Sequence, residues 1–237
     1  MSRTVVITGG TKGMGRELSL AFAREGHAVV ALYANDDAAA SRLRAEFDAM
    51  NARGCVAKHD AASDDPALWA RQEIAEAKSL TLIHNACAPF SPGPLHQLHW
   101  QDFQSHIDVA VKGAWFCTQA LIRPMLKKGG GAIINILTSV IEEENPPKGF
   151  AAYVTAKHAL RGFTQALAAE YAPRGVRVFS VSPGFMDTPL TQGWDERLRE
   201  AIRGASHRIT QPAGAAARIV ELAGNGNLPG HGEDYPV

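Results

Sequence analysis

Three side chains near the middle of the 237-residue chain have the types and spacing of a proton-transfer device. Ser139 follows an apolar run, and Tyr153 and Lys157 come next, four residues apart. Residues four apart share one face of a helix. A lysine there would favour the ionised phenol, lowering its pKa from about 10 toward the working range of a general acid or base. The spacing also fits a packed tyrosine and a solvated lysine, so the pair alone establishes no site.

A glycine-rich turn near the start of the chain is the second chemical signal. The β-branched run Thr4 to Thr8 predicts a buried strand, and it leads into Gly9-Gly10-Thr11-Lys12-Gly13-Met14-Gly15 before a helical pattern. Such a turn lets backbone amides and a helix N-terminus approach a pyrophosphate. The spacing is neither the standard dinucleotide fingerprint nor a P-loop. A tight turn that binds nothing is the alternative.

Together these motifs resemble the short-chain dehydrogenase/reductase family. The resemblance extends from the first strand to about residue 190, with its landmarks in the family's order: Thr8-Gly9-x-x-x-Gly13-x-Gly15, Asp60, Asn85-Ala86, Ser139, Tyr153-x-x-x-Lys157, Pro183-Gly184 and Thr188. It implies an NAD(P)-dependent oxidoreductase. In that reading Tyr153 is the acid/base, Lys157 is its electrostatic partner and ribose anchor, and Ser139 orients the substrate.

The resemblance also implies a set of cofactor contacts and no metal. Asp60 would meet the adenine edge, although an acid before a helix is also a common cap. The full expected set is Gly9, Thr11, Lys12, Gly13, Met14, Gly15, Tyr33, Asp60, Ala61, Asn85, Ala86, Tyr153, Lys157, Pro183, Gly184 and Thr188.

The end of the second expected strand favours NADP(H) over NAD(H). An acid at that place would receive the ribose hydroxyls of NAD, but the residue is Tyr33, and Lys12 adds a cation on the phosphate side. Asp36 and Asp37 argue for NAD if the loop folds back. We expect them instead to complement the dipole at the start of the next helix.

Strand-like and helix-like patterns alternate along the chain, without a linker or repeat. Apolar runs predict strands at 4–8, 28–33, 55–58, 80–85, 132–138 and 176–182, and helical patterns fill 14–25, 38–52, 66–78, 100–128 with a break, 152–172 and 211–224. Near-continuous apolar strands suit a sheet covered on both faces. The chain is therefore predicted to be one α/β domain over residues 1–237: a doubly wound, Rossmann-type parallel sheet with helices on both faces. Glycines 26, 54, 129–131 and 175 are expected at helix ends.

Composition limits the function classes. Formal net charge is zero, with 24 basic and 24 acidic residues, so neither nucleic acid nor an anionic membrane is an expected partner. No apolar run approaches the ~20 residues that span a bilayer. The cysteines at 55, 87 and 117 lack metal-site spacing and predict free thiols in a reducing compartment. A soluble, cytoplasmic protein is expected.

Two positions depart from the family pattern. Cys87 stands where a glycine normally makes room near the cofactor, and Ala110 stands where family members usually have an asparagine. That asparagine helps hold a water that links the lysine to solvent. Alanine retains the main-chain carbonyl, so a weakened or rerouted proton relay is expected. His106 or Asp108 could compensate, but we expect both on a helix surface.

The expected substrate is a small or carrier-bound carbonyl compound. The sequence is most similar to reductases of 3-oxoacyl thioesters, which implies an NADPH-dependent ketone reductase for that class or a polyketide-type intermediate. A segment at 188–210 is expected to be a lid whose Trp194, Leu198 and Ile202 form an apolar face. An alcohol or sugar dehydrogenase of the same family is one alternative, and a non-catalytic NADP(H)-binding protein is another. A homodimer or homotetramer is expected.

Overall fold

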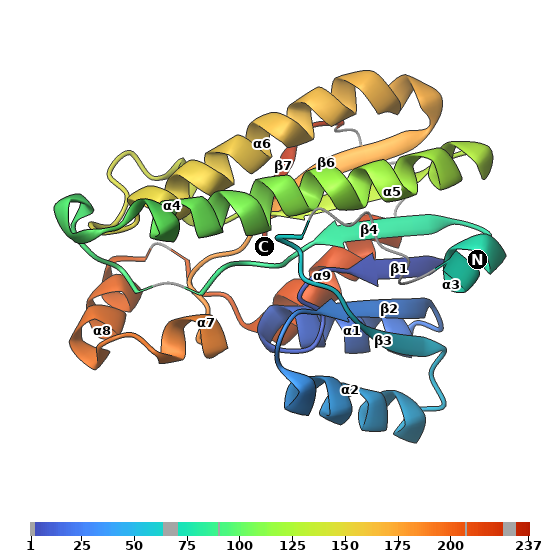
Figure 1. Ribbon diagram of the computed structural model, residues 1–237, viewed down its shortest axis with the longest axis horizontal. Coiled ribbons are helices and arrows are strands. Elements are labelled where there is room, and N and C mark those ends of the chain that lie inside the picture. The colour runs from blue at the N-terminus through green and yellow to red at the C-terminus, as the bar shows by residue number, and fades with distance from the viewer. Residues whose placement is uncertain (1–2, 64–70, 90, 207, 225–230) are drawn as a thin grey trace.

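A parallel sheet runs through the centre of the protein in the computed structural model, which describes residues 3–63, 71–89, 91–206, 208–224 and 231–237. Within this part of the chain its order is β3-β2-β1-β4-β5-β6-β7 (Figure 1). The strands are β1 (Thr4–Ile7), β2 (Ala28–Tyr33), β3 (Gly54–Lys58), β4 (Leu80–His84), β5 (Gly131–Ile136), β6 (Val176–Ser182) and β7 (Asp234–Pro236). The predicted doubly wound sheet is confirmed.

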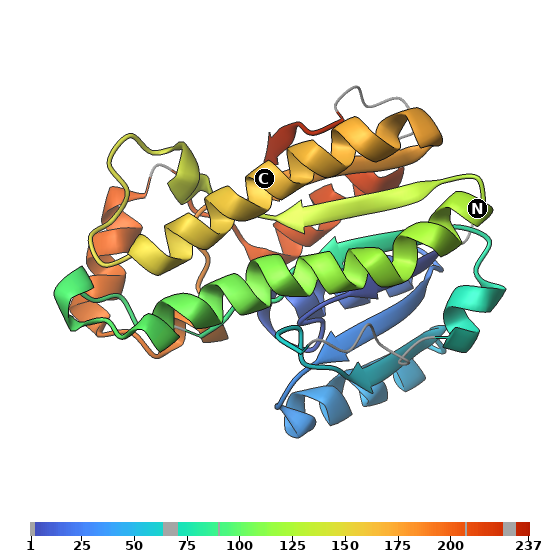
Figure 2. The ribbon, with the colours of Figure 1, turned by 45° about the horizontal axis from the view of Figure 1, so that its top comes forward.

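Helices cover both faces of the sheet (Figures 1 and 2). They are α1 (Gly13–Arg24), α2 (Asp37–Ala49), α3 (Arg71–Glu76), α4 (Trp100–Ile107), α5 (Gly113–Lys127), α6 (Ala151–Tyr171), α7 (Pro189–Gln192), α8 (Glu196–Ala205) and α9 (Pro212–Gly224). The break expected within 100–128 is a π-helical turn, Asp108–Lys112, between α4 and α5. The predicted helix 66–78 is observed only as α3, and its first residues lie outside the described part of the chain.

Two apolar layers flank the sheet because alternate residues of each strand point to opposite faces. Val5 and Ile7 of β1 pack with helices α1, α2 and α9, whereas Val6 packs with α5 and α6. Both faces of the central strands are therefore buried. This explains why their sequences read as continuous apolar runs rather than alternating ones.

The strand order reverses between β1 and β4. From β1 the sheet continues through β2 to β3 on one side, and from β4 through β5 to β7 on the other. Ligands of open parallel sheets bind outside the carboxyl ends of the strands at such a switch point. The glycine-rich turn follows β1 at this edge, and Asn85 and Ala86 follow β4.

Left-handed backbone occurs at most, but not all, of the glycines expected at helix ends. Gly26, Gly129 and Gly175 have φ of 75°, 82° and 83°. The expectation for Gly131 is wrong, because this residue begins β5. The expectation for Gly54 is also wrong, because Asn51, at φ 49°, takes the left-handed conformation after α2. Gly54 instead makes room for a neighbour: a Cβ there would lie 2.6 Å from the Phe47 ring.

Among the described residues, no helix combines the length and the apolar character that crossing a bilayer requires.

Candidate active site

The turn after β1 brings backbone segments unusually close together. Gly9 and Gly13 have φ of 63° and 53°, a left-handed conformation that glycine adopts without strain. A Cβ on Gly15 would lie 2.0 Å from the Gly9 carbonyl oxygen, and one on Gly10 would lie 2.9 Å from the Ala31 Cβ. At Gly9 and Gly13 the backbone conformation favours glycine, and at Gly10 and Gly15 there is no room for a larger side chain.

Hydrogen bonds fix this turn to the end of β4. The Thr8 hydroxyl accepts from the main-chain N–H groups of Asn85 and Ala86, both at 3.0 Å. The Asn85 amide donates to the carbonyls of Thr8 and Gly9, both at 3.1 Å. The predicted residues of both strand ends therefore form one rigid unit, in which the Asn85 side chain holds the turn.

The start of α1 suits an anionic group. Among the described residues no side chain caps α1, whose N-cap is Lys12, so the amides of the first turn lack a side-chain partner. The side chains of Thr11 and Met14 are buried. A pyrophosphate would thus meet main-chain N–H groups and the positive end of the helix. The cradle fits the phosphates of a dinucleotide.

Tyr153 and Lys157 lie together on α6, as predicted. The Lys157 Nζ lies over the tyrosine ring, 5.7 Å from its centroid. Lys157 is buried and donates a hydrogen bond of 2.7 Å to the Ile136 carbonyl at the end of β5. The spacing of one helical turn therefore brings phenol and amine to the carboxyl edge of the sheet.

The electrostatic expectation for Tyr153 is wrong in its direction. Burial raises the pKa of the phenol, and a hydrogen bond with the Thr138 side chain acts in the opposite sense. Lys157 lies over the ring and gives its hydrogen bond to a carbonyl. Burial also lowers the pKa of Lys157. Desolvation is therefore the largest influence on the pKa of both groups.

Thr138, which sequence reasoning missed, is the hydroxyl that hydrogen-bonds Tyr153. Ser139, the predicted substrate orienter, follows it and begins a 3-10 turn (Ser139–Glu142). The Ser139 N–H donates to the Pro183 carbonyl at 2.8 Å, which ties the end of β5 to the loop after β6. The adjacent Thr138-Ser139 pair at a strand end was the available signal for this hydroxyl.

Two further side chains, those of His106 and Cys87, lie close to Tyr153 and Lys157. His106 of α4 is buried, with its ring edge-on to Tyr153 at 6.0 Å between centroids. The prediction of a surface position for His106 is therefore wrong. Asp108 is partly buried and accepts a hydrogen bond from Gln104. Cys87 lies near enough to Tyr153 and Lys157 for its thiol to influence the pKa of both groups.

The end of β2 carries paired charges. The Tyr33 hydroxyl donates to the Asp37 carboxylate at 2.9 Å, and the Lys58 ammonium lies 3.1 Å from the same carboxylate. Lys12 pairs with Asp36 at 3.5 Å, and Asp36 caps α2. The prediction that these acids serve the start of the helix is confirmed. A carboxylate nevertheless lies beside the uncharged Tyr33.

The loop after β6 folds back toward the glycine turn. A Cβ on Gly13 would lie 3.5 Å from the Thr188 Cβ, and Thr188 caps α7. Gly184 is confined, because a Cβ there would lie 2.3 Å from the Arg208 carbonyl oxygen. Thr188 is thus close to the turn, as a shared cofactor site requires.

The two candidates after β3 have local roles. The Asp60 carboxylate accepts from the Ala62 N–H at 2.9 Å and so stabilises a turn. Ala61 is buried, and a Cβ on Gly113 of α5 would lie 2.6 Å from its carbonyl oxygen.

An apolar wall adjoins Tyr153, and we define it as Phe150, Trp194, Leu198 and Ile202. The Phe150 ring meets the rings of both Tyr153 and Trp194 edge-on, at 6.0 and 5.6 Å. The predicted apolar face of the 188–210 segment therefore exists and packs beside the phenol.

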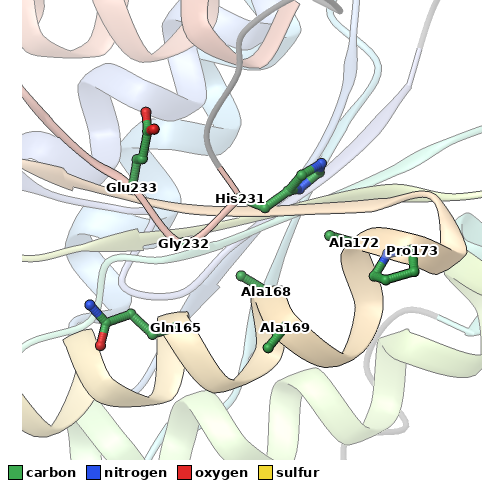
Figure 3. A pocket seen from close by; sticks show the side chains of 8 residues that line it. All are labelled: Gln165, Ala168, Ala169, Ala172, Pro173, His231, Gly232 and Glu233. Carbon is green, nitrogen blue, oxygen red and sulfur yellow. The ribbon is translucent and has the colours of Figure 1, made fainter.

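A separate hollow lies at the other half of α6. One side of the hollow is formed by Gln165 and nearby residues of α6 together with Ala172, which follows the helix. The other side is formed by the segment His231–Glu233 (Figure 3). None of the predicted site residues lines it. It therefore lies apart from the candidate active site.

Burial of His84 at the end of β4 makes stability sensitive to acid. Burial lowers its pKa from 6.5 to about 3, and its Nε2 lies 3.1 Å from the Thr118 hydroxyl. Below pH 6.5 His84 binds a proton in the unfolded chain but not in the folded chain. The free energy of unfolding therefore falls as the pH drops toward 3. His84→Gln should remove this loss, which is ~4 kcal/mol between pH 6.5 and 3. Denaturant titrations across this pH range measure it, and equal losses in both proteins would contradict the assignment.

Comparisons with known proteins agree with this geometry. The sequence model of the short chain dehydrogenase family matches residues 3–199. The chain is 31% identical over 224 residues to 3-oxoacyl-[acyl-carrier-protein] reductase of Synechocystis sp., covering 94% of this chain and 89% of the relative. It is also 31% identical to acetoacetyl-CoA reductase of Allochromatium vinosum, covering 100% and 97%.

A solved structure of the same family has a similar fold. The fold matches a short chain dehydrogenase of Burkholderia cenocepacia in complex with NADP, with a TM-score of 0.85, 26% identity and coverage of 100% of this chain and 96% of that one. The family match covers most of the chain, and the glycine turn and the tyrosine–lysine pair lie at the same edge of the sheet. The chain belongs to the short-chain dehydrogenase/reductase family and is an NAD(P)-dependent oxidoreductase.

Proposed function

We propose that the protein is an NADPH-dependent reductase of ketones whose substrate is a 3-oxoacyl thioester. The observation that carries this proposal is the position of Tyr153 and Lys157 beside the Thr138-Ser139 strand end. The names of relatives 31% identical to the chain support the thioester class. The apolar wall beside Tyr153 supports a substrate with an apolar acyl part.

Each residue has a distinct part in the proposed reaction. The nicotinamide, when bound, supplies a hydride to the carbonyl carbon. Tyr153 donates its phenolic proton to the carbonyl oxygen as general acid, and Ser139 hydrogen-bonds that oxygen. Lys157 holds the ribose and stabilises the phenolate. The hydrogen bond with Thr138 also stabilises the phenolate.

The test is reduction of acetoacetyl-CoA by the purified protein. NADPH absorbance should decline with one hydroxyacyl product formed per NADPH consumed. Two comparison assays measure the reduction of acetoin with NADPH and the oxidation of secondary alcohols with NADP⁺. Turnover of the alcohols without reduction of acetoacetyl-CoA would contradict the thioester proposal. Binding of NADPH without turnover of any substrate would contradict an enzymatic role.

NADP preference rests on Lys12, whose side chain is 57% exposed and whose Nζ lies 3.5 Å from an oxygen of the Asp36 carboxylate. An ammonium group free to turn toward a 2′-phosphate would form a charge-assisted hydrogen bond. Lys12→Ala should therefore weaken NADPH binding ~10-fold and leave NADH binding nearly unchanged. Calorimetric Kd values for the two cofactors measure the difference.

Asp36→Asn is the matched variant for this prediction. Asparagine caps a helix as well as aspartate, so α2 keeps its cap while the charge beside Lys12 is lost. NADPH should then bind more tightly than to the unsubstituted protein. Equal weakening of NADPH and NADH by Lys12→Ala would remove Lys12 from cofactor discrimination.

A further inference from the structure

His106 is a buried titratable side chain that the proposed reaction leaves without a role. It is 4% exposed, and α4 lies side by side with α6 (Figure 2). Its ring meets the Tyr153 ring edge-on, at an interplanar angle of 75° and 6.0 Å between centroids. Lys157 lies over the same phenol at 5.7 Å. A buried histidine, a buried lysine and a partly buried tyrosine therefore lie in one cluster.

The surroundings of His106 keep its imidazole neutral. Burial and the positive charge of Lys157 lower its pKa to about 4, while Asp102 on its own helix opposes the shift. Tyr153 and Lys157 face it from α6. A neutral imidazole carries one proton donor and one acceptor. It can therefore give up one proton and receive another at the opposite ring nitrogen.

The backbone beyond His106 is irregular. The helix passes directly into the π-helical turn Asp108–Lys112, and Ala110 within that turn is buried. Such turns in helices are frequent at functional sites. The Ala110 side chain offers no donor or acceptor, whereas His106, one helical turn earlier, brings two ring nitrogens to the site.

We propose that His106 relays protons to Tyr153 during turnover, acting as a positioning and relay residue. This inference rests on the proposed reductase function. When Tyr153 loses its proton to the substrate oxygen, the O–H bond breaks at the phenol and forms on the product. His106 then donates its N–H proton, directly or through one water, and the phenolic O–H bond re-forms. As it does so, the other ring nitrogen takes a proton from a solvent water, which is released as hydroxide, so that the imidazole stays neutral as the opposite tautomer. Proton exchange with water then restores the original tautomer before the next turnover.

Three variants test the relay with NADPH and acetoacetyl-CoA. His106→Phe keeps a ring against Tyr153 but removes the protons, and kcat should fall on the order of 10²-fold with little change in KM. His106→Ala should lose as much, and added imidazole should restore part of its kcat. His158→Phe makes the same substitution at an exposed position of α6 and should retain the original kcat.

The outcomes separate this inference from the proposed function. Original kcat in His106→Phe, or a loss in His106→Ala that imidazole does not relieve, would overturn the relay while leaving the reductase in place. An unsubstituted protein without turnover would overturn both. A loss confined to KM would assign His106 to packing and so overturn the relay.

Discussion

Replacement of Tyr153 by phenylalanine is expected to lower kcat for acetoacetyl-CoA reduction by ~10³-fold. The substitution removes one hydroxyl and keeps the ring that contacts Phe150, His106 and Lys157. The general acid is then lost while the packing remains. Initial rates at saturating NADPH measure the change, and calorimetry should show NADPH binding within ~2-fold of the original value.

Tyr171→Phe is the matched control for Tyr153→Phe. Tyr171 is the last residue of α6, and its ring lies beneath the Arg174 guanidinium, 5.5 Å away. It takes no part in the candidate active site, so kcat should be unchanged. Substantial turnover in Tyr153→Phe would show that another group protonates the substrate oxygen. His106 would then be the first group to examine.

Substitution of Gly15 by alanine should abolish cofactor binding and destabilise the fold. The added Cβ would lie 2.0 Å from the Gly9 carbonyl oxygen and 2.6 Å from the Asn85 side-chain nitrogen. One of these atoms is backbone, so the turn itself must move. We expect a loss of ~3 kcal/mol, the upper range for overpacking. For a chain of this size that loss corresponds to a Tm lower by ~10 °C.

Gly162→Ala separates this steric effect from the general effect of replacing a glycine. Gly162 lies within α6, and a Cβ there would meet nothing within 4 Å. Alanine should stabilise that helix by up to ~1 kcal/mol. Thermal unfolding and NADPH calorimetry on both variants provide the comparison. NADPH binding by Gly15→Ala at the original affinity would show that the cofactor does not depend on this turn.

Much of the fold could be predicted from the sequence, because the patterns that indicate it involve residues close together in the chain. Continuous apolar runs predicted strands buried on both faces. The predicted bounds 28–33 and 176–182 agree with those of β2 and β6. Tyr153 and Lys157 share a face because the helical period dictates it. The glycine-rich turn was recognisable because few other residues fit a left-handed or crowded backbone. Each of these features depends on neighbours within a few positions.

Contacts between distant segments were decided by the tertiary structure. The sequence around His106 resembles a helix surface, and only the packing of α4 on α6 buries this side chain against Tyr153. The same packing desolvates the phenol, so its pKa rises although a lysine stands one turn away. The motif by itself determined which groups could exchange a proton. Their burial, and so their proton affinities, depended on segments far along the chain, because desolvation is a property of everything that surrounds a group.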